Sequence, residues 1–444
     1  MSWRLRNFAR VYAASRWLRR RFTPAGRALL VLLGAAAVLG LDTRRTMAFQ
    51  LFALAAALLL LAWLTSLQRR RPAVALERST PALATVGEPF ACRYRLRCQG
   101  VRALTGLRLR DELADDYPSA AQLARKTDLP DEPLNWFDRR VGYPRWLAAV
   151  RRRRGADLDE LQLPRLAPGS VHEIAVSVTP LRRGTLRFDR GRLLHADPLG
   201  LVNAVTDCEL PGEVLVLPRV HPVPALRLPG ERRFQRGGVS RSLNVGDSQE
   251  FVQLRDYRPG DPLRHIHWRS FARRGEPVVK EFQDEYFTRY ALVLDTFGAH
   301  VDAPCFEAAV SVAASFVAAM DTREALLDLL FVEDRAYRLT AGRGVGQPLE
   351  LLRVLAAVEP APRTDFALLA EHVLGQAERL SACVVVLLGL DAGRRDLVER
   401  LRSRGVRPIV LAIAAGATRS GDPAVHWVDP ADVAGALRKV TGPC

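Results

Sequence analysis

A stretch of charged and aromatic residues, 237–282, holds the densest group of side chains in this chain that could do chemistry. Bidentate arginine–carboxylate pairs are specific in geometry, so we expect a hydrogen-bonded ion network here, with Tyr257 and Trp268 as apolar anchors. Three uses of the network stay open: a brace between two modules, a docking face for a partner, and an active site. The charged residues concerned are Arg255, Arg264, Arg273, Glu250, Asp256 and Asp261.

Two aspartates follow apolar runs in the last third of the chain. Asp295 comes directly after residues 290–294, and Asp391 comes directly after residues 382–390. Both runs are expected to be buried strands. In sheets of parallel strands, ligands bind beyond the carboxyl ends of the strands. Both carboxylates are therefore candidates for a ligand site.

Several reaction classes lack the residues that they need. No serine or cysteine lies in a nucleophile elbow, and the glycine-rich run 342–348 lacks the Lys-Ser/Thr pair of a nucleotide loop. Glu276 and Lys280 are four residues apart, which does not fit the Glu-x-Lys of many nucleases. His265 and His267 would share a face of a strand, but no third ligand is evident. The six cysteines fit no zinc spacing. The sequence favours a protein that is not an enzyme.

The elements that must position Asp295 and Asp391 alternate between strand and helix. Strands are expected at 290–297, 325–332, 382–390 and 407–413, with a short antiparallel partner at 336–342. Helices are expected at 304–322, 346–358, 365–380 and 394–404. Such alternation predicts an α/β fold with a mostly parallel sheet and helices on both faces.

Residues 72–230 have a different pattern. Short runs alternate between apolar and polar residues and are bounded by glycine and proline, which predicts half-buried strands in a β-sandwich-like module. A polar insertion at about 114–163 interrupts it. The arginine run 151–154 within the insertion is expected to face solvent or lipid headgroups.

The first 71 residues indicate a membrane anchor. Two apolar stretches, about 25–41 and 47–67, are separated by a five-residue link, which predicts a transmembrane hairpin. A signal peptide is the alternative, but the basic leader is long and no small-residue cleavage site precedes the second stretch. Arginines are more numerous on the two outer flanks than in the link, so both ends are expected in the cytoplasm. The predicted location is the bacterial cytoplasmic membrane, with two passes and cytoplasmic soluble domains.

The formal net charge of +17 permits binding to nucleic acid or anionic lipid through an arginine-rich surface. However, 62 of the 65 basic residues are arginine, which is typical of a GC-rich coding bias rather than of a selected polycation. Nucleic acid is therefore disfavoured as a partner; if it did bind, its affinity would depend steeply on salt.

The central stretch closely resembles the bacterial "domain of unknown function 58" proteins. The family pattern runs Glu-Phe-x-x-Leu-Arg-x-Tyr-x-x-Gly-Asp-x-x-Arg-x-Ile-x-Trp-x-x-x-Ala-Arg and is followed by a basic and an acidic position. The hairpin, the β-rich part and the α/β part agree too, so the resemblance covers most of the chain. The matching residues are Glu250, Phe251, Leu254, Arg255, Tyr257, Gly260, Asp261, Arg264, Ile266, Trp268, Ala272, Arg273, Lys280 and Glu285.

The resemblance implies a von Willebrand factor A-like carboxyl domain. Such domains often bind a divalent ion through Asp-x-Ser-x-Ser, a later Thr and a later Asp, all of which are oxygen ligands. Here Asp295, Thr364 and Asp391 match, but Phe297 and Ala299 stand at the two Ser positions. A metal-free binding face is favoured, and a degenerate Mg²⁺ site is the alternative.

The resemblance also implies a partner, a MoxR-type AAA+ ATPase, and a role in assembling or maturing protein complexes. The expected division of the chain is a basic leader with two transmembrane helices (1–71), a β-rich module (72–230), a signature segment (231–289) and a von Willebrand factor A-like domain (290–444).

Overall fold

The computed structural model divides into two units, each described here by itself. The first comprises Met1–Arg219 with Arg353–Val358, and the second comprises Val220–Leu352 with Glu359–Cys444. The structure describes residues 3–39, 46–69, 72–114, 117–118, 136–224, 234–235, 251–259, 261, 263, 266–282, 286–297, 303–320, 325–342, 346–361, 366–416 and 424–440.

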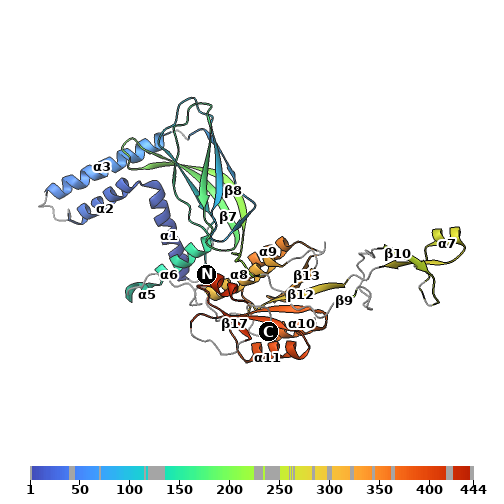
Figure 1. Ribbon diagram of the computed structural model, residues 1–444. Coiled ribbons are helices and arrows are strands. Elements are labelled where there is room, and N and C mark those ends of the chain that lie inside the picture. The colour runs from blue at the N-terminus through green and yellow to red at the C-terminus, as the bar shows by residue number, and fades with distance from the viewer. Residues whose placement is uncertain are drawn as a thin grey trace. The chain divides into compact units, whose positions relative to one another are not determined.

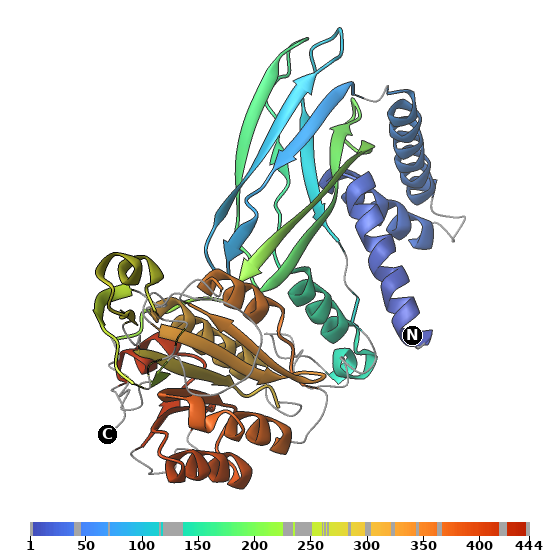
Figure 2. The same cartoon turned by 90° about the vertical axis from the view of Figure 1, so that its right-hand side faces the viewer.

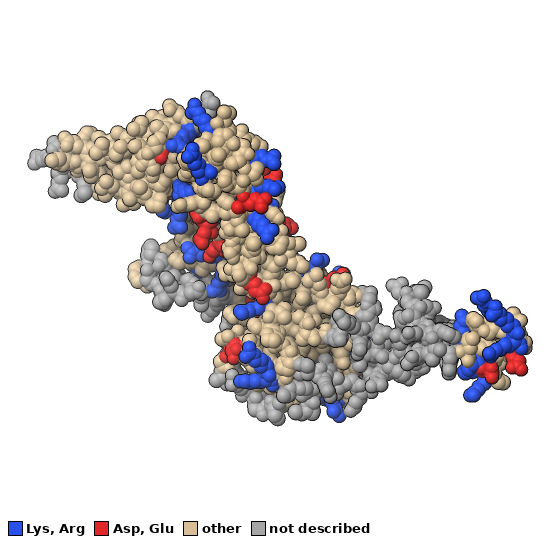
Figure 3. All heavy atoms as spheres, turned by 45° about the horizontal axis from the view of Figure 1, so that its top comes forward, with Lys and Arg blue, Asp and Glu red and all other residues tan. Residues whose placement is uncertain are grey.

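The first unit begins with three helices (Figure 1): α1 (Trp3–Arg21), α2 (Pro24–Leu39) and α3 (Thr46–Gln68). By length and composition, α3 alone among the described helices can cross a bilayer; only 17% of its apolar window is buried. In the face drawn in Figure 3, the arm formed by α2 and α3 is almost free of charged side chains. With 16 residues, α2 is apolar but shorter than a usual span. The two-pass hairpin therefore stays a prediction.

Two sheets of mostly antiparallel strands follow, and their facing sides enclose a common apolar core, as in a β-sandwich (Figure 2). In β3 (Phe90–Cys98), Cys92, Tyr94, Leu96 and Cys98 are buried and the residues between them are exposed, as expected for a half-buried strand. One sheet has the order β1-β3-β6 and the other β2-β8-β7-β4-β5. The remaining strands are β1 (Val74–Ser79), β2 (Leu83–Thr85), β4 (Leu107–Leu113), β5 (Leu161–Gln162), β6 (Val171–Val178), β7 (Gly184–Ala196) and β8 (Asn203–Leu217).

The predicted polar insertion contains two helices, α5 (Trp136–Val141) and α6 (Tyr143–Arg154). Its arginine run 151–154 forms the last turn of α6, where Arg151 and Arg152 are exposed. Trp146, also in α6, is fully buried. It lies against Tyr12 of α1, with ring centroids 5.6 Å apart. The insertion thus packs on the leader helix.

The second unit contains a mixed sheet with the order β14-β13-β12-β15-β16-β17, and β14 is its antiparallel edge. Helices α10 and α11 share a core with one face of the sheet, whereas α8 contacts β12, β15 and β16. This confirms the predicted α/β alternation. Its elements are β9 (Phe234–Gln235), β12 (Tyr286–Leu294), α8 (Ala303–Ala319), β13 (Ala325–Val332), β14 (Ala336–Ala341), α10 (Ala367–Leu374), η2 (Ala377–Arg379), β15 (Ala382–Leu387), α11 (Ala392–Ser403), β16 (Pro408–Ile413), β17 (Val425–Val428) and α12 (Val433–Arg438). Helix α9 (Pro348–Ala357) is divided between the two units at Arg353.

The signature segment contains a small module of its own, an antiparallel pair formed by β10 (Phe251–Asp256) and β11 (Val278–Phe282). Between them lies the short helix α7 (Trp268–Arg274), which contacts β11. A glycine in the left-handed conformation, Gly275 with φ 74°, ends this helix and turns the chain into β11. We call β10, α7, β11 and the turn between β10 and α7 the signature module.

Candidate functional site

The carboxyl ends of β12 and β15 lie side by side at the point where the strand order reverses, because β13 lies on the other side of β12. Such switch points are where doubly wound sheets bind ligands. Asp295 directly follows β12, and its backbone N–H donates to the carbonyl of Val386 at 2.9 Å. Asp391 is the N-cap of α11, which follows β15. Both predicted aspartates therefore lie at this edge.

Arg394, in the first turn of α11, connects the two aspartates. Its Nε donates to Asp295 Oδ2 at 2.7 Å, and its Nη1 donates to Asp391 Oδ2. Its Nη2 donates to the carbonyl of Phe297 at 3.1 Å. One guanidinium thus serves three acceptors, and its planar fork of five donors fixes the direction of each bond.

Asp295 is fully buried and accepts two further hydrogen bonds. The backbone N–H of Phe297 donates to Oδ1, and that of Leu388 donates to Oδ2, both at 2.9 Å. Burial raises the pKa of Asp295, and Arg394 with the two N–H donors opposes the rise. Burial also disfavours the Arg394 cation, but Asp295 and Asp391 outweigh it and raise the pKa of Arg394. Three donors therefore converge on the carboxylate of Asp295.

Aromatic rings complete the surroundings of Arg394. Its Cζ lies 5.0 Å from the centre of the Phe366 ring, which packs edge-on against Phe297 at 6.1 Å. Phe297, at a position where the resemblance calls for Ser, is buried. Thr296 donates its hydroxyl to the carbonyl of Val332 and so does not reach the aspartates. The guanidinium supplies, inside the protein, the positive charge that a metal ion would bring.

The metal hypothesis named three ligands, and the structure places two of them around Arg394; Thr364 lies outside the described residues. Nowhere in the described part of the chain do three or more His, Cys, Asp or Glu side chains come together as a metal site requires. The arrangement has an internal cation that competes with a divalent ion for both carboxylates.

The polar residues of the signature module shape its turn. Arg255 donates to both oxygens of Asp261, with Nη1–Oδ2 and Nη2–Oδ1 distances of 2.7 Å. The backbone N–H of Arg258 also donates to Asp261, at 2.9 Å. These bonds, those from Arg255 first, lower the pKa of Asp261 to about 2. Of the predicted network, the structure therefore contains the Arg255–Asp261 pair. Asp256 and Arg273 are exposed, and Glu250, Gly260 and Arg264 lie outside the described residues.

The apolar residues of the module divide into an inner and an outer set. Val278, Val279 and Ile266 are buried within it. Trp268 is 61% exposed and Leu263 is 66% exposed. Trp268 packs edge-on against Phe271, with centroids 6.1 Å apart. Trp268, expected as an apolar anchor, thus lies on the surface of the module, because α7 is only two turns long and covers little area.

Sequence reasoning missed two charged residues of the second unit. Arg394 was predicted only as the start of a helix; the signal was its place three residues after an aspartate that caps the helix. Asp328, in the middle of β13, is 1% exposed. It accepts from Arg289 Nε at 2.7 Å and from Thr340 Oγ1 at 2.5 Å. Because its acceptors are used within the sheet, Asp328 has a structural role.

Comparisons with known proteins match a part of the chain that includes most of the signature segment. The family described as "Protein of unknown function DUF58" matches residues 253–422. The "Uncharacterized protein YeaD" of Bacillus subtilis (strain 168) is 30% identical over 137 residues, which are 30% of this chain and 33% of the relative. The chain thus matches about a third of the length of that relative.

Two solved structures are similar to parts of the chain. The CARDB domain of PF1109 from Pyrococcus furiosus is 11% identical and covers 33% of this chain and 97% of its own, with a TM-score of 0.18. The manganese-loaded TRAP protein of Plasmodium vivax is 13% identical and covers 36% of this chain and 74% of its own, with a TM-score of 0.28. At these scores neither structure informs the site.

Proposed function

We propose that this chain, which belongs to the DUF58 family, is a non-enzymatic, membrane-anchored interaction protein that works with a MoxR-type AAA+ ATPase in assembling or maturing protein complexes. The signature module carries this proposal. Its ion pair holds a turn, while its tryptophan faces outward. A turn held by an ion pair, with an exposed tryptophan beside it, is suited to recognition, because tryptophan often dominates interface energetics.

The exposed surface of the module has the composition of a binding face. Tryptophan and arginine are the residues that most often dominate interface energetics. Around Trp268, the exposed neighbours in α7 are Arg269, Arg273 and Arg274, and basic side chains cover much of the module in Figure 3. We therefore expect the partner surface to be acidic, with an apolar recess that receives the indole.

The contacts of the two aspartates at the edge of the α/β sheet support a binding role rather than a catalytic one. A general base needs a carboxylate that is free to accept a proton. Asp295 and Asp391 are both engaged by Arg394, and Asp295 has no exposed surface. We also infer that the α/β unit is von Willebrand factor A-like, since its mixed sheet has an antiparallel edge strand and a polar cluster at the switch point.

The membrane topology is part of the proposal. We infer two passes, with α2 as the shorter span, because α2 and α3 pack on each other and the intervening link has fewer arginines than the outer flanks. This topology puts the signature module and the α/β unit in the cytoplasm, where an AAA+ ATPase finds its nucleotide.

Affinity purification from membranes tests the partnership. We expect the tagged full-length chain to recover a MoxR-type ATPase, and Trp268→Ala to lower the recovery at least about ten-fold, as the loss of an interface tryptophan does. Trp136→Ala, at another highly exposed tryptophan, is the matched control and should leave recovery unchanged. Repeated purifications of the unmodified chain that contain no such ATPase would refute the partnership.

A further inference from the structure

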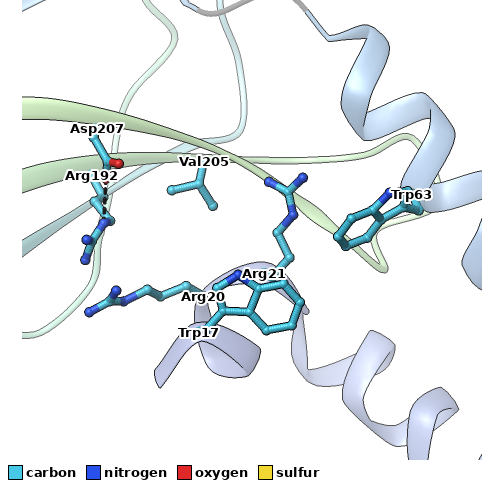
Figure 4. A pocket seen from close by; sticks show the side chains of 7 residues that line it. All are labelled: Trp17, Arg20, Arg21, Trp63, Arg192, Val205 and Asp207. Carbon is cyan, nitrogen blue, oxygen red and sulfur yellow. Dashed lines mark hydrogen bonds and ion pairs between the residues drawn. The ribbon is translucent and has the colours of Figure 1, made fainter. Parts of the chain in front are cut away.

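A cavity of about 300 Å³ lies where the leader helix α1 ends, between α1, α3 and the sheet strands β7 and β8. Figure 4 shows the side chains of Arg20, Arg21 and Arg192 around it, together with the indoles of Trp17 and Trp63. The residues that line it are Trp17, Arg20, Arg21, Trp63, Arg192, Val205 and Asp207.

Several arginine side chains gather next to this cavity. Four arginines converge on one buried carboxylate, Glu112. Its Oε2 lies 2.7 Å from Arg20 Nη2 and 3.0 Å from Arg16 Nη2, and it also pairs with Arg192. Arg110 Nε is 3.8 Å from Oε1. Glu112 is thus shared among several guanidiniums, one of which, Arg192, also pairs with Asp207 at 2.6 Å.

The effect of these neighbours is visible at Arg20. Burial lowers the pKa of Arg20 to about 10; Glu112 opposes the shift, and Arg16 and Arg192 add to it. The Nε of Arg20 is buried and has no hydrogen-bond partner among the described residues. An anion in the cavity would offset the repulsion between the guanidiniums.

Arg21 is held differently from the arginines around Glu112. Its Cζ lies 4.8 Å from the centre of the Trp63 ring, a cation–π contact. This contact fixes the guanidinium plane at the cavity and leaves its N–H groups available to an oxyanion. Asp207, the carboxylate that lines the cavity, accepts a hydrogen bond from Arg192 instead.

The aromatic residues place the cavity at the level of lipid headgroups. Trp63 lies in the last turns of α3, the helix that can span a bilayer. It packs against Phe22 and Trp17, with ring centroids 6.4 Å and 6.5 Å away. Tryptophans gather at the membrane–water interface, where one part of the ring is in apolar surroundings and the other is hydrated.

We propose that this cavity binds the phosphate of an anionic phospholipid headgroup, with Arg20 and Arg21 as donors and the two tryptophans beside the glycerol backbone. The site rests on the membrane anchoring proposed above, but not on the ATPase partnership. A lipid bound here joins α1, α3 and the sheet strands and so fixes the soluble part of the first unit at the membrane surface.

The test uses the full-length chain in detergent and native mass spectrometry with phosphatidylglycerol or phosphatidylcholine of the same acyl chains. We expect one phosphatidylglycerol to be retained in preference to phosphatidylcholine. Arg21→Gln should weaken that binding about ten-fold, because it removes a charge-assisted contact. Arg19→Gln is the matched control: it removes the same charge from an exposed position two residues away, on the opposite side of α1, and should change binding less than about two-fold.

Further arms distinguish lipid binding from a folding defect and from binding of a soluble anion. Arg21→Lys keeps the charge but not the stacked guanidinium, so its binding should lie between that of Arg21→Gln and that of the unmodified chain; a loss as large as that of Arg21→Gln would show that charge at this position does not hold the lipid and would overturn the proposal. So would equal losses in Arg19→Gln and Arg21→Gln, or equal retention of both lipids. Excess inorganic phosphate should not displace phosphatidylglycerol; displacement would make the cavity a site for a soluble anion. Membrane fractionation of Arg21→Gln measures anchoring separately, and it should match the unmodified chain.

Discussion

Replacing Arg394 by leucine tests the internal-cation interpretation of the sheet edge. The variant leaves Asp295 fully buried, with two backbone donors but no opposite charge. Removing one partner of a buried ion pair typically costs at least about 3 kcal/mol, since the other charge is left uncompensated. A loss of that size in local stability corresponds to about a hundred-fold faster opening of the neighbouring strands.

The pH dependence of this loss has a definite sign. Burial already raises the pKa of Asp295 above its ordinary value, and without Arg394 one opposing influence is gone, so the folded-state pKa rises further. Between the unfolded and folded pKa values the folded state then binds more protons, and stability falls as pH rises. The deficit of Arg394→Leu should therefore be larger at about pH 8 than at about pH 5.

Hydrogen exchange read by mass spectrometry, on peptides that cover β12 and β15, measures this local stability in the full-length chain. Arg395→Leu is the matched control, because Arg395 is the next residue of α11 and is exposed; it should change stability by less than about 0.5 kcal/mol. In an Asp295→Asn background, Arg394→Leu should cost only about 1 kcal/mol, because no buried charge remains. Equal effects of Arg394→Leu and Arg395→Leu, or a deficit independent of pH, would refute the internal-cation interpretation.

Three further outcomes are expected. Arg255 lowers the pKa of Asp261 to about 2, so the ion pair stabilises the signature module at pH values above the ordinary pKa of aspartate. This stabilisation is lost as the pH falls towards 2. Hydrogen exchange of β10 and β11, corrected for intrinsic rates, should therefore speed up on acidification in the unmodified chain but not in Asp261→Asn. Calorimetry with Mg²⁺ or Mn²⁺ should give no saturable heat, and saturable binding abolished by Asp391→Asn would contradict this. Alkaline phosphatase should be active when inserted in the link 42–46 and inactive at the carboxyl end; the reverse would disprove the topology.

Helices and strands could be predicted where the pattern of apolar residues lies within a single element. The alternation along β3 and the apolar run of β15 appear directly in the sequence, and the Arg255–Asp261 pair joins residues six positions apart. Asp295 and Asp391 could be placed because both follow buried strands and the carboxyl ends of parallel strands share an edge.

What joins these aspartates could not be predicted in the same way. Arg394 is 99 residues from Asp295, and nothing in either local sequence says that one guanidinium reaches both carboxylates. The cluster at Glu112 is of the same kind, since Arg20 lies 92 residues away and Arg192 lies 80 residues away. Such contacts depend on how helices dock on sheets, which hydrophobic periodicity does not specify. The exposure of Trp268 likewise depends on how little of α7 the module covers.

These two arginine clusters differ in their balance of charge, and the difference indicates where a ligand belongs. At the sheet edge two carboxylates share one guanidinium, and backbone N–H groups satisfy the remaining oxygens, so the site is closed by residues of the chain itself. At Glu112 four guanidiniums share one carboxylate beside a cavity, and the buried Nε of Arg20 has no hydrogen-bond partner among the described residues. The family resemblance suggests the aspartates as the ligand-binding residues, whereas the electrostatics of the two clusters suggest the arginines. The arginine-rich composition, interpreted from the sequence as a coding bias, is used structurally at both places, because the planar guanidinium presents five donors in a fixed geometry.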